Sequence, residues 1–279
     1  MTEGVTTERV KIGAWLVTED RDTAFDGSTK VENPHQERTR IRVPLVTVDV
    51  RITNRFGLQA AATIPDVTRT AVIPQATGTV NFSETFSGLG DTSVLGWYRI
   101  RPIRRWYPLL NFGVSLPTGK TEQPRFRSEL ANGSLVPMSR LQRSSGTFDP
   151  LFGASLSRGM NPWTLFASLA ARTPLHENDD GLRTGASVEV NSGIARYAGT
   201  HRISLFGRLG WLHRRQDVFR GTPVLVGGGN WIYATPGVAI LAGKGVNVQA
   251  EVKLPLYRSL ANKQLDSAAI FQFGISRAF

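Results

Sequence analysis

The stretch VNVQAEVKLPLY, residues 246–257, alternates between apolar and polar side chains. The apolar members take every second position: Val246, Val248, Ala250, Val252, Leu254 and Leu256. The positions between them hold polar residues, namely Asn247, Gln249, Glu251 and Lys253. Successive side chains of a β-strand point to opposite faces, so this period of two predicts a strand with one apolar and one polar face.

The same alternation recurs along the whole chain. In IFQFGISRAF, residues 270–279, one side holds Phe271, Phe273, Ile275 and Phe279, and Arg277 alone breaks its apolar character. Comparable segments include RVKIGAWLVTE, RTRIRVPLVTVDVRI, LLNFGVSLP, DPLFGASLSR and HRISLFGRLGWLHR. We count about twelve strands and no convincing helix. Within residues 40–52 the apolar parity switches near Leu45 and Val46, which predicts a β-bulge beside Pro44.

The connections between these segments alternate between long and short. Long polar stretches such as 20–37, 66–89 and 120–145 are separated by tight ones such as 54–57, 104–105 and GKG at 243–245, and a final loop is expected in RSLANKQLD. An up-and-down outer-membrane barrel has short periplasmic turns on one rim and longer extracellular loops on the other. We therefore predict an all-β fold, a single transmembrane antiparallel barrel domain spanning 1–279 in a bacterial outer membrane.

Composition agrees with this prediction. The 279 residues include no Cys, 41% are hydrophobic, and no run of eighteen apolar residues suggests a membrane helix. The uncharged stretch 221–243 contains three consecutive glycines and Pro236, which a helix would not tolerate. The first ten residues lack the features of a secretory signal, which leaves open whether Met1 is native. The net charge of +11 comes from arginines spread along the chain, unlike a nucleic-acid-binding module.

Aromatic residues near the strand ends are candidates for the interfacial girdles of such a barrel, although some have inward parity. They are Trp15, Trp97, Tyr98, Trp106, Tyr107, Trp163, Trp211, Trp231 and Tyr257. The last residue, Phe279, resembles the terminal aromatic signal of outer-membrane proteins, which implies recognition by the barrel assembly machinery. The alternative is that Phe279 ends a core strand of a soluble β protein.

Four phrases resemble the outer-membrane barrel family named for the meta-pathway of phenol degradation. They are FSGLGDTSVLGWYRI, NFGVSLPTGK, GTFDPLFGASLSR and VQAEVKLPLYRSLANKQL, in this order over roughly residues 85 to 279. The first third of the chain matches the family in strand pattern alone. The resemblance implies an outer-membrane transporter and supplies no set of functional residues.

The polar parity of the strands should line the lumen. The candidate lumen residues are Arg40, Arg42, Arg51, Arg99, Arg101, Arg202, Arg208, Asp49, Asp91, Glu189, Glu251 and Lys253. Basic residues outnumber acidic ones in this set, so a wet pore would favour anions. The alternative is that these charges pair across the lumen and plug it, because small barrels fill their interiors with side chains.

Other chemistry finds little support in the residues. GVSLPTGKT has five residues between Gly113 and Gly119, where a phosphate-binding loop needs four, and no helix pattern follows. His35, His176, His201 and His213 have no metal-ligand spacing, so we expect no metal and no cofactor. Outer-membrane phospholipases use Ser, His and Asn, which draws attention to His201 and His213, but no motif of that family is present.

We therefore expect a passive channel for small solutes, including aromatic or anionic ones, and not an enzyme. A structural or adhesive barrel acting through its loops is the alternative, and an outer-membrane hydrolase is the third. The expected partners are outer-membrane lipid, lipopolysaccharide, the barrel assembly machinery and a small-molecule solute. Nucleic acid is not expected, and the sequence leaves the oligomeric state open.

Overall fold

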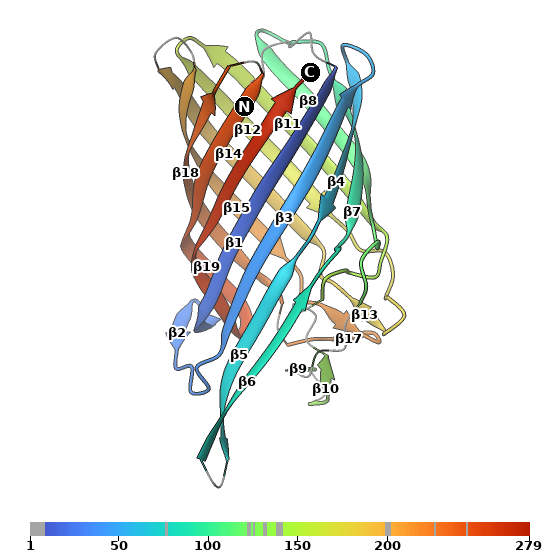
Figure 1. The fold of residues 1–279 in the computed structure, drawn as a ribbon, viewed down its shortest axis with the longest axis vertical. Helices are drawn as coiled ribbons and strands as arrows, with labels where there is room; N and C mark the ends of the chain where they lie inside the picture. Colours follow the sequence, from blue (N-terminus) through green and yellow to red (C-terminus); the bar gives the residue numbers. More distant parts are fainter. Residues whose placement is uncertain are drawn as a thin grey trace.

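The computed structural model describes residues 9–75, 78–121, 124, 126–130, 133–137, 142–198, 202–225, 227–243 and 245–279, which form a closed antiparallel β-barrel (Figure 1). The ring consists of β1 (Val10–Gly27), β3 (Arg38–Arg51), β4 (Phe56–Thr63), β7 (Thr92–Arg99), β8 (Trp106–Leu116), β11 (Asp149–Met160), β12 (Trp163–Arg172), β14 (Ser187–Ala198), β15 (Ile203–Arg214), β18 (Gly229–Leu241) and β19 (Val246–Ala278). The first strand pairs with the last, Lys11 lying opposite Ala278, so the ring has no open edge. Closure satisfies the backbone of every strand inside a membrane.

The long element β19 crosses the barrel twice. Its first half pairs with β18, from Asn247 opposite Leu241 to Leu260 opposite Gly229. Its second half runs back along β1, and the amide of Ala278 donates to the carbonyl of Gly245 at the rim where β19 began. The eleven ring elements therefore make twelve passes, which agrees with the predicted number.

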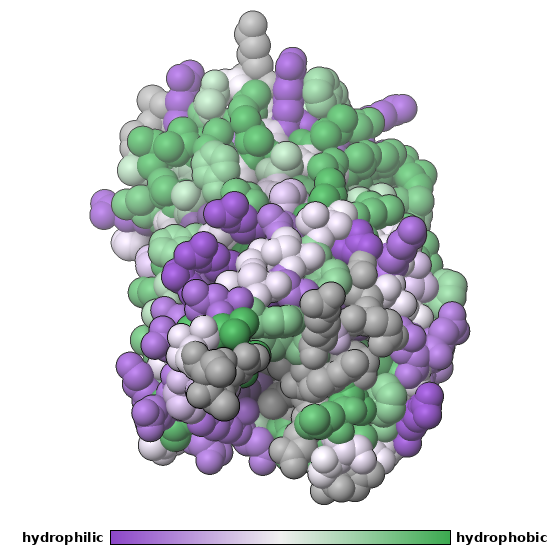
Figure 2. Space-filling view, turned by 60° about the horizontal axis from the view of Figure 1, so that its bottom comes forward, coloured by the Kyte–Doolittle hydropathy of each residue, from purple (hydrophilic) through white to green (hydrophobic). Residues whose placement is uncertain are grey.

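The barrel exposes apolar side chains on its outer face and keeps polar ones inside. On β1, Ile12 and Leu16 are exposed, whereas Gly13 between them is buried. Phe271, Phe273 and Ile275 continue this outer surface on β19. Figure 2 shows the resulting hydrophobic surface around the barrel behind the more hydrophilic loop end. Such a belt is stable when it faces acyl chains, so the strands span a membrane.

The predicted bulge beside Pro44 is wrong. Strands β1 and β3 pair without a register shift from Val10 opposite Val50 to Arg21 opposite Thr39. The parity of β3 therefore continues unchanged past Pro44. What changes along this strand is the environment of its outer face, which carries valines at 46, 48 and 50 but arginines at 40 and 42.

The two rims differ as the loop lengths predict. Five short connections join the ring strands at one rim, which also holds both chain ends: β3 to β4, β7 to β8, β11 to β12, β14 to β15 and β18 to β19. Long connections form the other rim, except that the expected last loop is a tight turn inside β19, where Asn262 has a φ of 60°. No helix in the described ranges is long and apolar enough to cross a membrane.

The long connections contain the remaining strands. These are β2 (Thr29–Val31), β5 (Asp66–Gln75), β6 (Gly78–Ser87), β9 (Arg127–Glu129), β10 (Leu135–Pro137), β13 (Leu182–Arg183), β16 (Val218–Phe219) and β17 (Thr222–Pro223). The hairpin β5–β6 projects beyond the barrel (Figure 1). Three other loops share a small apolar core of Leu130, Val136, Leu182 and Val224. The loops thus pack on one another at the mouth.

Candidate functional site

The inner face of the barrel is the candidate site, and seven of the predicted lumen residues share its parity. Thr39 and Gly13 are buried, so odd-numbered residues of β1 and β3 point inward, and strand pairing carries this assignment around the ring. The inward residues of the predicted set on the ring strands are Asp49, Arg51, Arg99, Glu189, Arg208, Glu251 and Lys253. In the structure Arg51, Arg99, Arg208, Glu189, Glu251 and Lys253 thus have inward parity, and their role as lumen lining stays a prediction.

Four predicted lumen arginines lie elsewhere. Arg40 and Arg42 point outward on β3, on the face of Val46 and Val48, because the chain does not bulge at Pro44. Arg40 lies 3.7 Å from the carboxylate of Asp20 on the same outer face. Arg101 and Arg202 lie outside the strands, exposed in the short turns. The apolar–polar alternation continues in the sequence around these arginines, but the outward apolar belt of the barrel does not extend that far along the strands.

The inward charges of the middle barrel pair with one another. Arg208 Nη2 donates to Glu251 Oε1 at 2.6 Å, and Lys253 Nζ donates to Glu189 Oε1 at 2.9 Å. Glu251 is 4% exposed and Gln249 Nε2 donates to its second oxygen. These two pairs join β19 to β14 and β15, and each is electrically neutral. Four of the predicted residues are therefore paired, but along one wall and not across the lumen, as the alternative supposed.

Two more ion pairs extend this group toward the loop end. Arg21 binds Glu19 through two hydrogen bonds of 2.7 and 2.8 Å, and Arg258 lies 3.5 Å from Asp266. Trp231 Nε1 also donates to Asp266. We call the eight charged residues the charged wall: Glu19, Arg21, Glu189, Arg208, Glu251, Lys253, Arg258 and Asp266. It occupies one side of the lumen, on β14, β15, β19 and β1.

Strands β8, β11 and β12, which follow β14 in the ring order, contribute many small inward side chains. These are Asn111, Gly113, Gly153, Ser155 and Ser168, and the larger inward residues among them are Leu109, Leu151 and Phe166. The middle of the lumen is therefore asymmetric in charge, with paired ions on the charged wall and neutral side chains on this side.

Inward aromatic rings lie flat against the wall because glycines stand opposite them. Trp15 is paired with Gly274, and a Cβ at Gly274 would come 2.1 Å from the indole. Trp97 covers Gly57 in the same way, at 2.2 Å. A side chain at either glycine would push the ring into the lumen. Glycine thus lets a large aromatic residue occupy the inner face without crossing it.

Basic residues predominate at the end of the lumen near the short turns. Lys11, Arg51 and Arg99 have inward parity there, with Asp49 directly opposite Lys11. Asp49 accepts a hydrogen bond from Trp97 Nε1 at 3.1 Å, and the Arg99 guanidinium lies 5.8 Å from the centre of the Trp97 ring. Positive charge therefore exceeds negative charge among these four residues.

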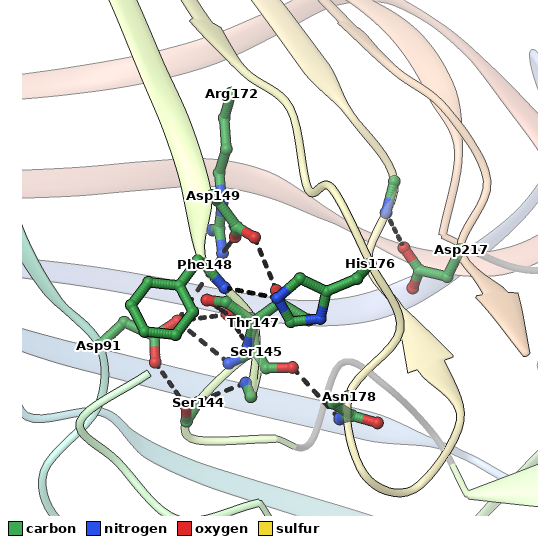
Figure 3. A network of polar contacts seen from close by, with 12 residues as sticks. Asp91, Ser144, Ser145, Thr147, Phe148, Asp149, Arg172, His176, Asn178 and Asp217 are labelled. Atoms are coloured by element: carbon green, nitrogen blue, oxygen red, sulfur yellow. Dashed lines mark hydrogen bonds and ion pairs between the residues drawn. The ribbon is translucent and has the colours of Figure 1, made fainter. Parts of the chain in front are cut away.

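A polar network ties the loop before β11 to the mouth of the barrel (Figure 3). Arg172 Nε on β12 donates to Asp149 Oδ2 at 2.7 Å, and Thr147 Oγ1 donates to Asp149 Oδ1 at 2.6 Å. Both Thr147 and Asp149 are fully buried. Asp91, at the start of β7, accepts hydrogen bonds from Ser144 and from the amide and hydroxyl of Ser145. The segment 144–149 is thus fastened to β12 through Arg172 and to Asp91 directly before β7.

Sequence reasoning placed Asp91 in the lumen and did not identify this mouth network. The available signal was the family-like phrases, because three of them meet here. GDTS contributes Asp91, GTFD contributes Thr147 and Asp149, and LPTG contributes Thr118, whose hydroxyl donates to the carbonyl of Gly90 at 2.8 Å. Phrases far apart in the sequence that share one resemblance are candidates for contact in space.

The histidine considered for hydrolysis faces away from the lumen. His213 stacks on Trp211 on the outer face, with ring centres 6.1 Å apart, and its Nδ1 lies 2.9 Å from Asn230 Oδ1. His201 lies outside the described residues. The observed partners of His213 are thus an indole and an amide.

Two hollows on the outer surface flank Pro236 of β18. One, of about 560 Å³, is lined by Leu16, Val238, Phe271 and Phe273 and reaches Glu251. The other, of about 700 Å³, is lined by Leu165, Ile194 and Leu209 and reaches Arg208. Both hollows therefore lie on the part of the wall that carries the Arg208–Glu251 pair.

Comparison with known proteins shows the fold. No family model and no curated protein matches the chain. The structure is similar to the COG4313 outer membrane channel from Pseudomonas putida F1, with a TM-score of 0.75 and 12% identity over 99% of this chain and 97% of that chain. It also resembles the translocator domain of the autotransporter NalP from Neisseria meningitidis, with a TM-score of 0.51 and 11% identity over 98% of this chain and 90% of that one. The predicted outer-membrane barrel is confirmed, and its apolar belt agrees with a location in the bacterial outer membrane.

Proposed function

We propose that the protein is a narrow passive channel for small solutes. The asymmetry of the lumen carries this proposal. The many small inward side chains of β8, β11 and β12 favour a passage beside the charged wall, and the glycines opposite Trp15 and Trp97 let these rings lie against the barrel wall. Fixed dipoles and paired charges along such a passage provide polar contacts without a net field in its middle.

We infer that anionic and aromatic solutes are favoured among those that fit. The neutral pairs Arg208–Glu251 and Lys253–Glu189 remove the mid-lumen field expected from the sequence, so the preference arises at the basic turn end. The resemblance to the phenol-degradation barrel family supports an aromatic solute. The hollows beside Pro236 offer apolar surface where an apolar solute could approach from the lipid.

Conductance of the purified, refolded protein in a planar bilayer under a KCl gradient tests this function. We expect small, stable current steps with a modest anion preference. Entry of benzoate into proteoliposomes, compared with uncharged benzyl alcohol and with glucose, then measures the solute preference. Inserted protein that gives neither current nor flux above that of empty liposomes would refute the channel.

The projecting hairpin favours a second candidate, a barrel that acts through its loops. Arg69 anchors β5 to the neighbouring segments. It binds Glu37, donates to Thr39 Oγ1 at 3.2 Å and lies 4.8 Å from the centre of the Phe126 ring. Burial lowers the pKa of the Arg69 guanidinium, while Glu37 opposes this shift. Such anchoring suits a hairpin that presents its tip to a partner. Deleting 72–81 should leave conductance intact in either case, and loss of cell adhesion in that variant would support this candidate.

A further inference from the structure

The net charge of the protein is concentrated at the rim of short turns. The five short connections contain no Asp or Glu, whereas a single loop on the opposite rim holds Glu177, Asp179 and Asp180. Eight exposed or outward arginines lie at the turn rim, and we call them the basic collar: Arg55, Arg101, Arg104, Arg105, Arg158, Arg196, Arg202 and Arg277. No collar arginine forms an ion pair with another described residue.

Three collar arginines point outward from the strands toward lipid. Arg158, Arg196 and Arg277 share the outer face with Leu156, Ile194 and Ile275 respectively, each exactly two residues away along its strand. Two strand residues span about 6.6 Å. The three guanidinium groups therefore lie near the turn-side end of the apolar belt, where exposed Met160 and Phe279 follow Arg158 and Arg277, close to the depth of lipid headgroups.

An aromatic ring holds each of these guanidinium groups in place. Arg158 lies 5.5 Å from the centre of the Trp106 ring, Arg196 lies 5.3 Å from Trp163, and Arg277 lies 4.7 Å from Phe279. Stacking on a ring face leaves the edge of the guanidinium free, and this edge is the part that binds a phosphate through two parallel hydrogen bonds.

The tightest turn of the rim keeps arginine at a conformational cost. Arg104 and Arg105 occupy the two central positions of the turn between β7 and β8, with φ values of 49° and 69°. A turn with two left-handed residues prefers Asn-Gly, because a side chain with a Cβ is strained there. The turn thus carries two arginines although its backbone conformation favours Asn and Gly.

We propose that the basic collar binds the headgroups of anionic phospholipids in the periplasmic leaflet. The outward guanidinium groups bind headgroup phosphates directly, and the turn arginines add a positive field below them. Zwitterionic phosphatidylethanolamine carries an ammonium group that cancels its phosphate charge, so the collar favours phosphatidylglycerol. A basic residue near an anionic membrane surface contributes about fivefold in binding.

Lipid retention tests the proposal with the whole protein in nanodiscs of phosphatidylethanolamine and phosphatidylglycerol. Native mass spectrometry counts the phosphatidylglycerol molecules that stay bound after release from the disc. We expect wild-type protein to retain phosphatidylglycerol over phosphatidylethanolamine and the double variant Arg158→Gln with Arg196→Gln to lose about tenfold or more of this preference. Arg277 is left unchanged because it adjoins the terminal Phe279.

Two further variants keep the result interpretable. Arg104→Asn with Arg105→Gly removes two charges and relieves the turn, so it should fold at least as well as wild type and lose part of the preference. Arg40→Gln with Arg42→Gln removes two outward arginines near the opposite rim and should leave the preference unchanged. Each variant is first checked for folding by its shift in gel mobility on heating.

Three results would overturn the proposal. The first is equal phosphatidylglycerol retention in wild type and both collar variants. The second is an equal loss of preference in the Arg40 and Arg42 control. The third is an unchanged lipid preference together with sedimentation on purified peptidoglycan that disappears in the Arg104 and Arg105 variant. That outcome would assign the collar to the cell-wall polymer.

Discussion

Single residues decide how much of the lumen stays open. A tryptophan on the inner face of a narrow barrel would cross much of the lumen if it stood upright. Trp15 and Trp97 instead lie over Gly274 and Gly57 in the neighbouring strands, so the missing Cβ atoms keep the rings flat. The role of Phe279 as an assembly signal belongs to this scale too and stays a prediction.

Adding one methyl group at Gly274 should narrow the channel. In Gly274→Ala the new Cβ would overlap the Trp15 ring, so the ring must swing inward or the strands must shift. We expect lower single-channel conductance and a loss of about 1–3 kcal/mol in stability. Gly207→Ala is the matched control, since a Cβ there meets nothing within 4 Å. Equal conductance in both variants would contradict this account of the glycine.

Asp149 should hold the loop segment 144–149 at the mouth. Asp149→Asn keeps the shape of the side chain but removes the charge that Arg172 binds. The Arg172 side chain is 37% exposed, so water screens its attraction to Asp149 and reduces the stability lost in this variant. We expect faster proteolysis of the connection between β8 and β11 and more frequent current fluctuations. Asp179→Asn, on an exposed loop, should change neither, and identical behaviour of the two variants would dismiss the network as a fastening.

At the scale of elements, strands were predictable and their surroundings were less so. Alternation in sequence depends on the residue itself and gave the parity of Arg208, Glu251 and Lys253 correctly. It failed for Arg40 and Arg42 because a change of environment along β3 looks the same as a bulge in sequence. The partners of an inward charge depend on strands far apart in the chain, so the pairs of the charged wall could be anticipated as a type but not assigned.

The neutral Glu189–Lys253 pair of the charged wall predicts that removing either partner changes the ion selectivity of the channel, in opposite directions. Glu189→Gln leaves Lys253 without the carboxylate it binds, which adds one net positive charge to the middle of the lumen. We expect the reversal potential under a KCl gradient to shift toward anion selectivity, and Lys253→Gln to shift it the opposite way. Glu177→Gln, in a loop outside the lumen, should leave it unchanged. Shifts of the same sign in both lumen variants would contradict the pairing.

At the scale of the whole molecule, the protein is built inside out relative to a soluble one. Among the described residues, large apolar side chains cover the outer face, and the buried apolar clusters are small and confined mainly to the loops. The twelve passes and the two unequal rims followed from alternation and loop length. The packing of the loops over the mouth could not be predicted from these patterns. Leu130 and Val224, which form a β-bridge there, lie in different loops far apart in the sequence.

The orientation of the barrel can be tested because the chain has no cysteine. Two single-cysteine variants are made. Asn81→Cys places the cysteine on the exposed hairpin strand β6, and Asn54→Cys places it in an exposed short turn. A bulky membrane-impermeant maleimide should label the first in intact cells and the second only after the outer membrane is broken. Labelling of Asn54→Cys alone in intact cells would reverse the assigned orientation.

The most direct test of the channel is whether water and ions reach the inner face of β11. Ser155 points into the lumen and Ala154, beside it on β11, points to lipid. Each is replaced by cysteine, and a negatively charged methanethiosulfonate reagent is added during current recording. We predict that Ser155→Cys reacts and its current falls, while Ala154→Cys keeps its full current. No change in the Ser155→Cys current, with the thiol shown to be unmodified, would mean that the lumen is closed to solutes.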